Sequence, residues 1–124
     1  MPNGKTVLHV EDNFDNRLLV RRLLQAFGYN VIEAENASKA REILKTNQPD
    51  LILMDINMPD VDGYTLTNEL KAMPKLQGIP IVAITANVMK GDRERTLSAG
   101  CDGYIEKPID VDKFIDQVDR FLGQ

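Results

Sequence analysis

The sequence contains little cysteine, no long apolar run and no excess of positive charge. Its single cysteine, Cys101, excludes an internal disulfide bond. No run reaches the roughly 18 apolar residues that a membrane-spanning helix needs, and the first residues lack the apolar core of a signal peptide. A formal net charge of -4 argues against a nucleic-acid-binding surface, which normally carries a basic patch. We therefore expect a cytoplasmic protein that contacts neither nucleic acid nor membrane.

The 124 residues have the size and composition of one globular domain. Hydrophobic residues make up 43% and charged residues 27% of the chain, which is too apolar for a disordered protein. No linker, internal repeat or low-complexity stretch divides the sequence. We expect residues 1–124 to form one domain with no output domain attached, and the initiating methionine and complete last helix favour a stand-alone protein.

Short apolar runs alternate with segments of helical period along the whole chain, which is typical of βα units around a parallel sheet. The fold class is therefore predicted to be α/β. The apolar runs predict strands at 6–10, 30–34, 50–54, 79–84 and 103–106.

The segments between the strands show apolar stripes that predict amphipathic helices. The first helix should begin after Asn13 as its N-cap and end at Gly28. Its buried face is predicted to contain Leu19, Leu23 and Phe27. A later helix should pack through Leu66, Leu70 and Met73.

The last helix has the clearest pattern, with Asp110 as its predicted N-cap and Gly123 beyond its end. By contrast, 88–99 carries many charged residues and few apolar ones, so its packing should be the weakest. The apolar stripe of the last helix consists of Val111, Phe114, Ile115, Val118, Phe121 and Leu122.

Polar side chains stand where the predicted strands end. Asp55 and Thr85 each follow a strand directly, and Lys107 comes shortly after the last one. Glu11 and Asp12 follow the first strand. Because the carboxyl ends of parallel strands lie at one edge of a sheet, these side chains should meet there. Three carboxylates beside one lysine would repel one another unless a divalent cation lay among them, so the sequence predicts a cation site.

These residues, in their order along the chain, resemble the receiver domain of bacterial two-component response regulators. The resemblance covers nearly the whole chain and is carried by five motifs: Glu11-Asp12, Leu51-Ile-Leu-Met-Asp55-Ile-Asn-Met-Pro59, Asp62-Gly63, Thr85-Ala86 and Lys107-Pro108. Residues 84–94 and 99–108 are similar to single-domain receivers and to receiver modules of hybrid sensor kinases. The family implies a three-layer, flavodoxin-like fold of five βα units with parallel strand order 2-1-3-4-5.

The resemblance implies a role for each residue of the site. Asp55 would be the phosphoacceptor and would take a phosphoryl group from a phosphohistidine or a small acyl phosphate. Thr85, Lys107 and the backbone N–H of Ala86 would contact the phosphoryl group. Thr85 and Tyr104 would form the switch that responds to it.

The implied cofactor is Mg²⁺, with Mn²⁺ as the alternative ion. Its expected ligands are Asp12, Asp55 and the main-chain carbonyl of Asn57, while Glu11 would act mainly through a metal-bound water. The family also implies a cis peptide bond between Lys107 and Pro108.

The implied partners are a sensor histidine kinase or a histidine phosphotransfer protein and, after phosphorylation, a downstream target protein. The target would bind the face formed by 88–99, 103–106 and the last helix. The protein would catalyse only its own phosphorylation and dephosphorylation, and would be a monomer or a weak dimer.

Three alternative functions share parts of this pattern. A pseudo-receiver would signal without phosphate, although the site residues are intact. A phosphohydrolase of the haloacid-dehalogenase type also uses a strand-end aspartate, Mg²⁺, a hydroxyl and a lysine, but needs a second acid where this chain has Asn57. A flavin carrier needs a phosphate loop rich in hydroxyls and glycine after the first strand, where 11–15 is acidic.

Two reactive side chains have no place in this site. His9 lies in the first strand, where a lone histidine is most often a core residue with satisfied hydrogen bonds. Cys101 lies among small residues, and packing explains it better than redox sensing. We expect both to be structural.

Overall fold

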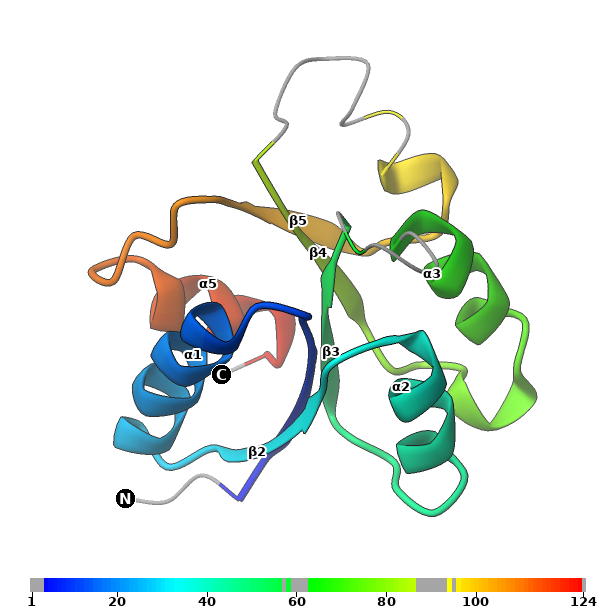
Figure 1. Cartoon of the computed structure of the whole chain (residues 1–124), viewed down its shortest axis with the longest axis horizontal. Helices are drawn as coiled ribbons and strands as arrows, with labels where there is room; N and C mark the ends of the chain where they lie inside the picture. Colours follow the sequence, from blue (N-terminus) through cyan, green and yellow to red (C-terminus); the bar gives the residue numbers. More distant parts are fainter. Residues whose placement is uncertain (1–3, 57, 59–62, 87–93, 95, 124) are drawn as a thin grey trace.

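Helices and strands alternate along the chain in the computed structural model, which describes residues 4–56, 58, 63–86, 94 and 96–123 (Figure 1). Short helical turns at 94 and 96–98 precede the last strand. The elements are β1 (Thr6–Val10), α1 (Phe14–Ala26), β2 (Asn30–Ala34), α2 (Ala37–Leu44), β3 (Leu51–Asp55), α3 (Gly63–Lys71), the 3-10 helix η1 (Pro74–Leu76), β4 (Ile81–Thr85), β5 (Gly103–Glu106) and α5 (Phe114–Phe121).

The five strands form one parallel sheet in the order β2-β1-β3-β4-β5, which confirms the predicted α/β class and the flavodoxin-like topology. The predicted strands agree with the observed ones to within two residues. The largest difference is at β4, which begins at Ile81 because Pro80 has no N–H to donate to a strand ladder. This order places the end of β3 between the ends of β1 and β4.

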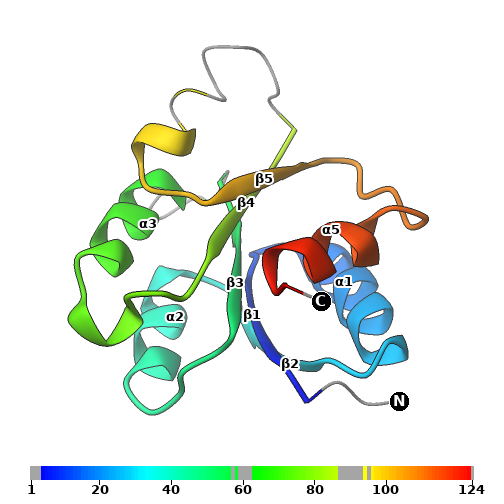
Figure 2. The same cartoon turned by 180° about the vertical axis from the view of Figure 1, so that it is seen from behind.

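Helices cover both faces of the sheet, with α1 and α5 on one side and α2 and α3 on the other (Figures 1 and 2). Successive strand residues point to opposite faces, so each strand contributes to two apolar cores. The core under α1 and α5 contains Val7, Leu51, Leu53, Val82, Ile84 and Ile105 from the strands. The core under α2 and α3 contains Leu8, Val10, Ile52, Met54, Ile81 and Ala83 from the strands.

The start and end of α1 agree with the prediction, but its buried face agrees only in part. The Asn13 side chain accepts a hydrogen bond from the Asn16 N–H at 2.9 Å, and Gly28 follows the helix with φ of 88°. Val20 and Leu24 are buried, whereas Leu19 is 38% exposed and Phe27 is 55% exposed. The prediction was right for Leu23, which packs against the core, and wrong for Leu19 and Phe27. Apolar residues occur on more than one side of this helix, and spacing alone does not choose between them.

The start of the last helix was also predicted wrongly. Helix α5 begins at Phe114, and Val111 lies in the preceding turn with 53% of its surface exposed. Asp110 is not its N-cap, because its carboxylate accepts instead from the Asp112 N–H within that turn at 3.0 Å. Val111 matches the helical period without belonging to the helix.

The later predicted stripes agree in part with the structure. Leu66 and Leu70 of α3 are buried, and Met73 packs against them from just beyond the helix. Most of the predicted weakly packed segment 88–99 lies outside the described residues. In the described part of the chain, no helix combines the length and apolar character that crossing a membrane requires.

Candidate functional site

Five polar residues meet at the carboxyl edge of the sheet, as the strand ends predicted. Asp55 is the last residue of β3 and Thr85 the last of β4. Glu11 and Asp12 follow β1, and Lys107 follows β5. The side chains of Asp55, Glu11 and Thr85 are buried, whereas Asp12 is exposed.

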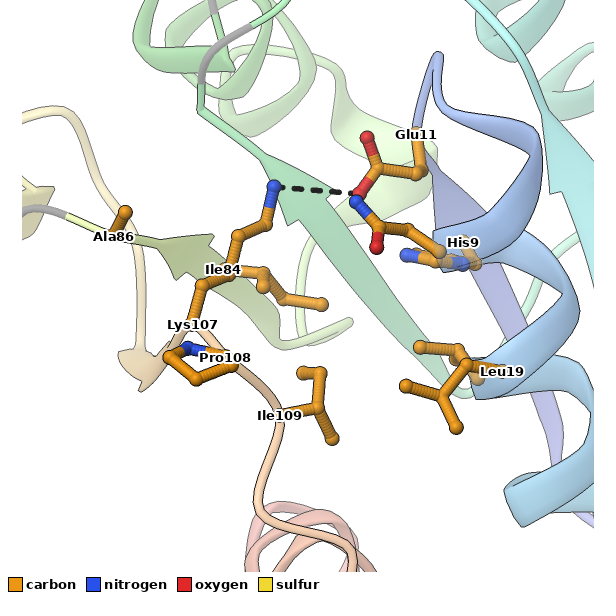
Figure 3. Close-up of a pocket in the computed structure, with 10 residues that line it drawn as sticks. His9, Glu11, Leu19, Ile84, Ala86, Lys107, Pro108 and Ile109 are labelled. Carbon is orange, nitrogen blue, oxygen red and sulfur yellow. Dashed lines mark ion pairs between the residues drawn. The ribbon is translucent and has the colours of Figure 1, made fainter.

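The three acids form one cluster around a single ammonium group. One carboxylate oxygen from each of Glu11, Asp12 and Asp55 lies within 4.8 Å of the others. The Lys107 Nζ lies 3.0 Å from Asp55 Oδ1. It also lies 3.4 Å from Glu11 Oε1, and Figure 3 shows this second ion pair. One lysine therefore faces two buried carboxylates, with the exposed carboxylate of Asp12 close to both acids.

The pKa values of these groups reflect the crowding of negative charge. Burial raises the pKa of Glu11 to about 7, and the hydrogen bond and charge of Asp55 add to the effect. Burial lowers the pKa of Lys107, but its hydrogen bond to Asp55 and the charges of both acids raise it above the ordinary value. The cluster thus fits a hard divalent cation, which would relieve the repulsion that now favours a proton on Glu11.

The remaining predicted ligand, Asn57, lies outside the described residues. The acids that the structure does describe are typical of the magnesium site of receiver domains. Carboxylate oxygens are the ligands that Mg²⁺ prefers in proteins.

The residues around the cluster connect β4 to the segment after β5. The Lys107 N–H donates to the Thr85 carbonyl at 2.9 Å, and the peptide bond between Lys107 and Pro108 is cis. Ala86 is exposed beside the pocket that contains Lys107. Tyr104 is half-buried and lines a groove of about 490 Å³ beside α5.

Two contacts that support the acids were not found from the sequence. The Gly63 N–H donates to the Ile56 carbonyl at 3.0 Å, and a Cβ on Gly63 would lie 2.4 Å from the Asp55 carbonyl oxygen. The Arg17 guanidinium donates to the Glu11 carbonyl at 2.8 Å. Glycine at 63 was visible in the Asp62-Gly63 motif, but its close approach to β3 depends on tertiary packing. The position of Arg17, one helical turn into α1, gave no signal.

The two reactive side chains outside the site behave differently from each other. The Cys101 thiol is buried beside the Thr67 hydroxyl at 3.8 Å, and burial raises its pKa, in line with a packing role. His9 is buried too, but neither ring nitrogen has a hydrogen-bond partner among the described residues. The predicted core position of His9 is therefore confirmed, whereas its predicted hydrogen bonds are not found among the described residues. Burial lowers the pKa of His9 to about 4, which leaves the ring neutral near pH 7.

Comparison with known proteins identifies the family. Residues 7–119 match the family described as the response regulator receiver domain. The chain is 45% identical over 119 residues to the polar-differentiation response regulator DivK of Brucella anthropi, covering 96% of this chain and 97% of that protein. The chain therefore belongs to the response regulator receiver family.

Solved structures agree with this assignment. The receiver domain of a Pseudomonas aeruginosa sensor histidine kinase, which has a magnesium ion in its active-site cleft, aligns with a TM-score of 0.88 and 35% identity, covering 98% of this chain and 99% of that one. The receiver domain of a Syntrophus aciditrophicus signal transduction histidine kinase aligns with a TM-score of 0.88 and 32% identity, covering 97% of this chain and 91% of that one.

Family and fold together define the kind of activity. The chain is a receiver domain similar to DivK and acts in phosphorylation-dependent two-component signalling. It is a phosphoacceptor rather than a true enzyme, and a receiver domain implies a histidine kinase as the source of the phosphoryl group.

Proposed function

We propose that Asp55 is the phosphoacceptor of a receiver domain that spans residues 1–124. The observation that carries this proposal is the place of its carboxylate, which is buried at the end of β3, 3.0 Å from the Lys107 ammonium and inside the acidic cluster. An Asp55 oxygen attacks the phosphorus of a phosphohistidine, so that a P–O bond forms as the P–N bond breaks. The imidazole leaves with the electrons of that bond and takes a proton from solvent.

Lys107 and Thr85 stabilise the transferred group. Phosphoryl transfer depends mainly on positioning and on neutralising charge, and the Lys107 ammonium already lies beside the reacting oxygen. The Thr85 hydroxyl and the Ala86 backbone N–H stand on the neighbouring strand end, where they contact phosphoryl oxygens. Loss of Lys107 should therefore slow transfer more than loss of Thr85, because only Lys107 offsets a full charge.

Mg²⁺, or Mn²⁺ in its place, fits the acids on the other side of Asp55. Asp12, Asp55 and the main-chain carbonyl of Asn57 would hold it directly, with Glu11 acting through a bound water. When bound, the ion supplies positive charge that offsets the phosphoryl oxygens. The acids themselves keep the ion next to Asp55 and out of contact with the apolar core.

Thr85 and Tyr104 form the proposed switch. A phosphoryl group on Asp55 gives the Thr85 hydroxyl a new acceptor and draws it toward β3. Thr85 shares a backbone hydrogen bond with Lys107, and Tyr104 lies on the adjacent strand opposite Ala83. Movement of Thr85 would let Tyr104 turn inward and change the surface around β5 and α5 that a target protein binds.

The phosphodonor is proposed to be a sensor histidine kinase or a histidine phosphotransfer protein in the cytoplasm. Exposed apolar side chains follow the site residues along the chain and offer docking contacts. Phe14 of α1, two residues after Asp12, is 62% exposed, and Val111, four residues after Lys107, is 53% exposed. The Arg17 guanidinium lies 5.8 Å from the centre of the Phe14 ring and adds a positive charge to these contacts. Such contacts suit a transient complex, and we propose that the free protein is a monomer or a weak dimer.

Covalent labelling tests the proposed phosphoacceptor. With Mg²⁺ and acetyl phosphate, peptide mapping by mass spectrometry should find phosphate on Asp55 alone. Asp55→Asn should abolish labelling, whereas Asp15→Asn, which changes an exposed acid at the start of α1, should leave it intact. Phosphate on another residue would refute this mechanism. No labelling of the wild type would favour the pseudo-receiver alternative, and steady release of phosphate from many added phosphoesters would favour the hydrolase.

A further inference from the structure

A pocket of about 370 Å³ extends from the acidic cluster into the space between α1 and the segment after β5. Glu11 and Lys107 lie at its polar end (Figure 3). Beyond them its walls are mainly apolar, and they come from β1, α1, β4 and the segment after β5. The apolar lining consists of Leu19, Val20, Ile84, Ala86, Pro108 and Ile109. The volume falls within the range of about 300–1,000 Å³ that is usual for small-molecule sites.

Beyond Glu11 and Lys107, the pocket is lined by two more polar residues, Asn16 of α1 and the buried His9 of β1. His9 is 1% exposed, and neither ring nitrogen has a hydrogen-bond partner among the described residues. Figure 3 shows one ring nitrogen directed toward the space between Lys107 and Leu19. Buried polar groups without partners are uncommon, since each one loses its hydrogen bonds to water without replacement. A ligand that bonded to His9 would remove this cost.

The charged groups around the pocket argue against a charged ligand. An anion would be repelled by Asp55 and Glu11, and a cation would lose its hydration against apolar walls near the Lys107 ammonium. A neutral histidine ring offers one donor and one acceptor, which a hydroxyl group can match. We propose that this pocket binds a small neutral molecule with an apolar ring or chain and one hydroxyl group hydrogen-bonded to His9. The proposal does not depend on phosphoryl transfer to Asp55.

Binding of phenol, with toluene and benzoate as matched probes, tests the proposal by NMR titration. Phenol should shift the amides of Leu19, Val20 and Ile109, and it should also shift one ring nitrogen of His9. The ring signals are unambiguous, because the chain has a single histidine. Benzoate should bind at least tenfold more weakly than phenol, since its charge faces the acids.

Two variants distinguish the contribution of the His9 hydrogen bond to binding from the contribution of the pocket itself. His9→Phe should lower the preference for phenol over toluene by roughly tenfold, the effect expected from losing one hydrogen bond. Leu19→Trp keeps His9 but fills the pocket from the half-exposed side, so it should abolish binding of both probes. Gln25→Trp places the same ring at an exposed position further along α1, and it should bind phenol as the wild type does.

Three results would overturn the proposal. They are phenol binding without a shift of the His9 ring nitrogens, an unchanged preference for phenol in His9→Phe, or full phenol binding in Leu19→Trp. If phenol causes no shifts at all while the His9 ring signals already show hydrogen bonds, the pocket holds water only. Labelling of Asp55 by acetyl phosphate, measured on the same samples, reports on the phosphoacceptor separately.

Discussion

The charged side chains of the site have unusual properties because the fold holds them close together and shields them from water. Asp55 and Glu11 are buried together, and Lys107 contacts both. Each of these charges would be unfavourable alone in that environment, and the Lys107 ammonium offsets part of the repulsion between the two acids. The excess of acid over base is what makes the cluster suitable for a divalent cation.

We predict weak Mg²⁺ binding that depends on Asp12. Few protein ligands and an exposed Asp12 leave water around the ion, which limits affinity, and Asp12→Ala removes one of the three charges. Isothermal titration calorimetry should show binding to the wild type and to Asp15→Ala but none to Asp12→Ala. Lys107→Met removes the competing ammonium, so it should raise the affinity. Equal affinity in Asp12→Ala and the wild type would place the ion elsewhere.

His9 should make the protein less stable in acid. Its pKa is about 4 in the folded protein, below the ordinary value of 6.5 for a free side chain, so between these pH values the unfolded chain binds more protons. Stability from the neutral ring is therefore present above pH 6.5 and is lost as the pH falls toward 4.

Urea unfolding measures this effect against a variant without the histidine. From pH 7 to pH 4, the wild type should lose up to about 3 kcal/mol more free energy of unfolding than His9→Phe. The opposing contribution of Glu11, whose raised pKa favours the folded state at low pH, is present in both proteins and cancels in the comparison. Adding Gln25→His to the His9→Phe variant places a histidine in solvent, and this should not restore the pH dependence of the free energy of unfolding. Parallel pH profiles for wild type and His9→Phe would contradict the argument.

At the scale of helices and strands, the sequence predicted the features that depend on the local pattern of apolar residues. It did not predict the features that depend on how separate segments pack together. Apolar runs located the strand ends, and with them Asp55 and Thr85, because a buried parallel strand is apolar on both faces. The buried side of α1 was assigned to Leu19 instead of Val20, because apolar residues surround much of that helix. Nothing local indicated that α3 begins against the backbone of β3, since the approach at Gly63 depends on how two separate segments pack.

Gly63 should be indispensable to the placement of α3 beside Asp55. A methyl group at this position would lie 2.4 Å from the Asp55 carbonyl oxygen and 2.7 Å from the Ile56 Cα, and both are backbone atoms that cannot rotate away. Gly63→Ala should lower the free energy of unfolding by about 1–3 kcal/mol and weaken Mg²⁺ binding, because relief of the clash moves Asp55.

Asn68→Ala is the matched control for that substitution. Asn68 is an exposed residue of α3, and alanine there should change stability by no more than about 0.5 kcal/mol. Urea unfolding and calorimetry on both variants provide the measurements. If Gly63→Ala were as stable as Asn68→Ala, the close approach of Gly63 to the backbone of Asp55 and Ile56 would not require glycine.

At the scale of the whole molecule, the site is connected to distant surface through a short series of contacts. The Lys107 N–H bonds to the Thr85 carbonyl, and β4 pairs with β5 along its length. On the far side of the sheet, the Tyr64 hydroxyl of α3 bonds to the Thr96 hydroxyl at 3.1 Å, joining α3 to the helical turns before β5. Two apolar cores pack against the two faces of the sheet and keep the strands in place. A change at the carboxyl edge of the sheet can therefore move the contacts around β5 and Thr96 while the strands keep their positions.

Phosphorylation should therefore rearrange the surface around β5 while the sheet keeps its structure, with Thr85 as the coupling residue. Beryllofluoride, a stable mimic of the phosphoryl group, should shift backbone amides at Thr85, Thr96, Leu97 and Tyr104 but leave those of β1 and β2 nearly unchanged. Thr85→Ala should still bind the mimic, because Lys107 and the acids remain, but the shifts at Thr96 to Tyr104 should shrink by more than half. Thr65→Ala changes an exposed threonine of α3 and should respond as the wild type does. Distant shifts of full size in Thr85→Ala would show that the signal leaves the site by another route.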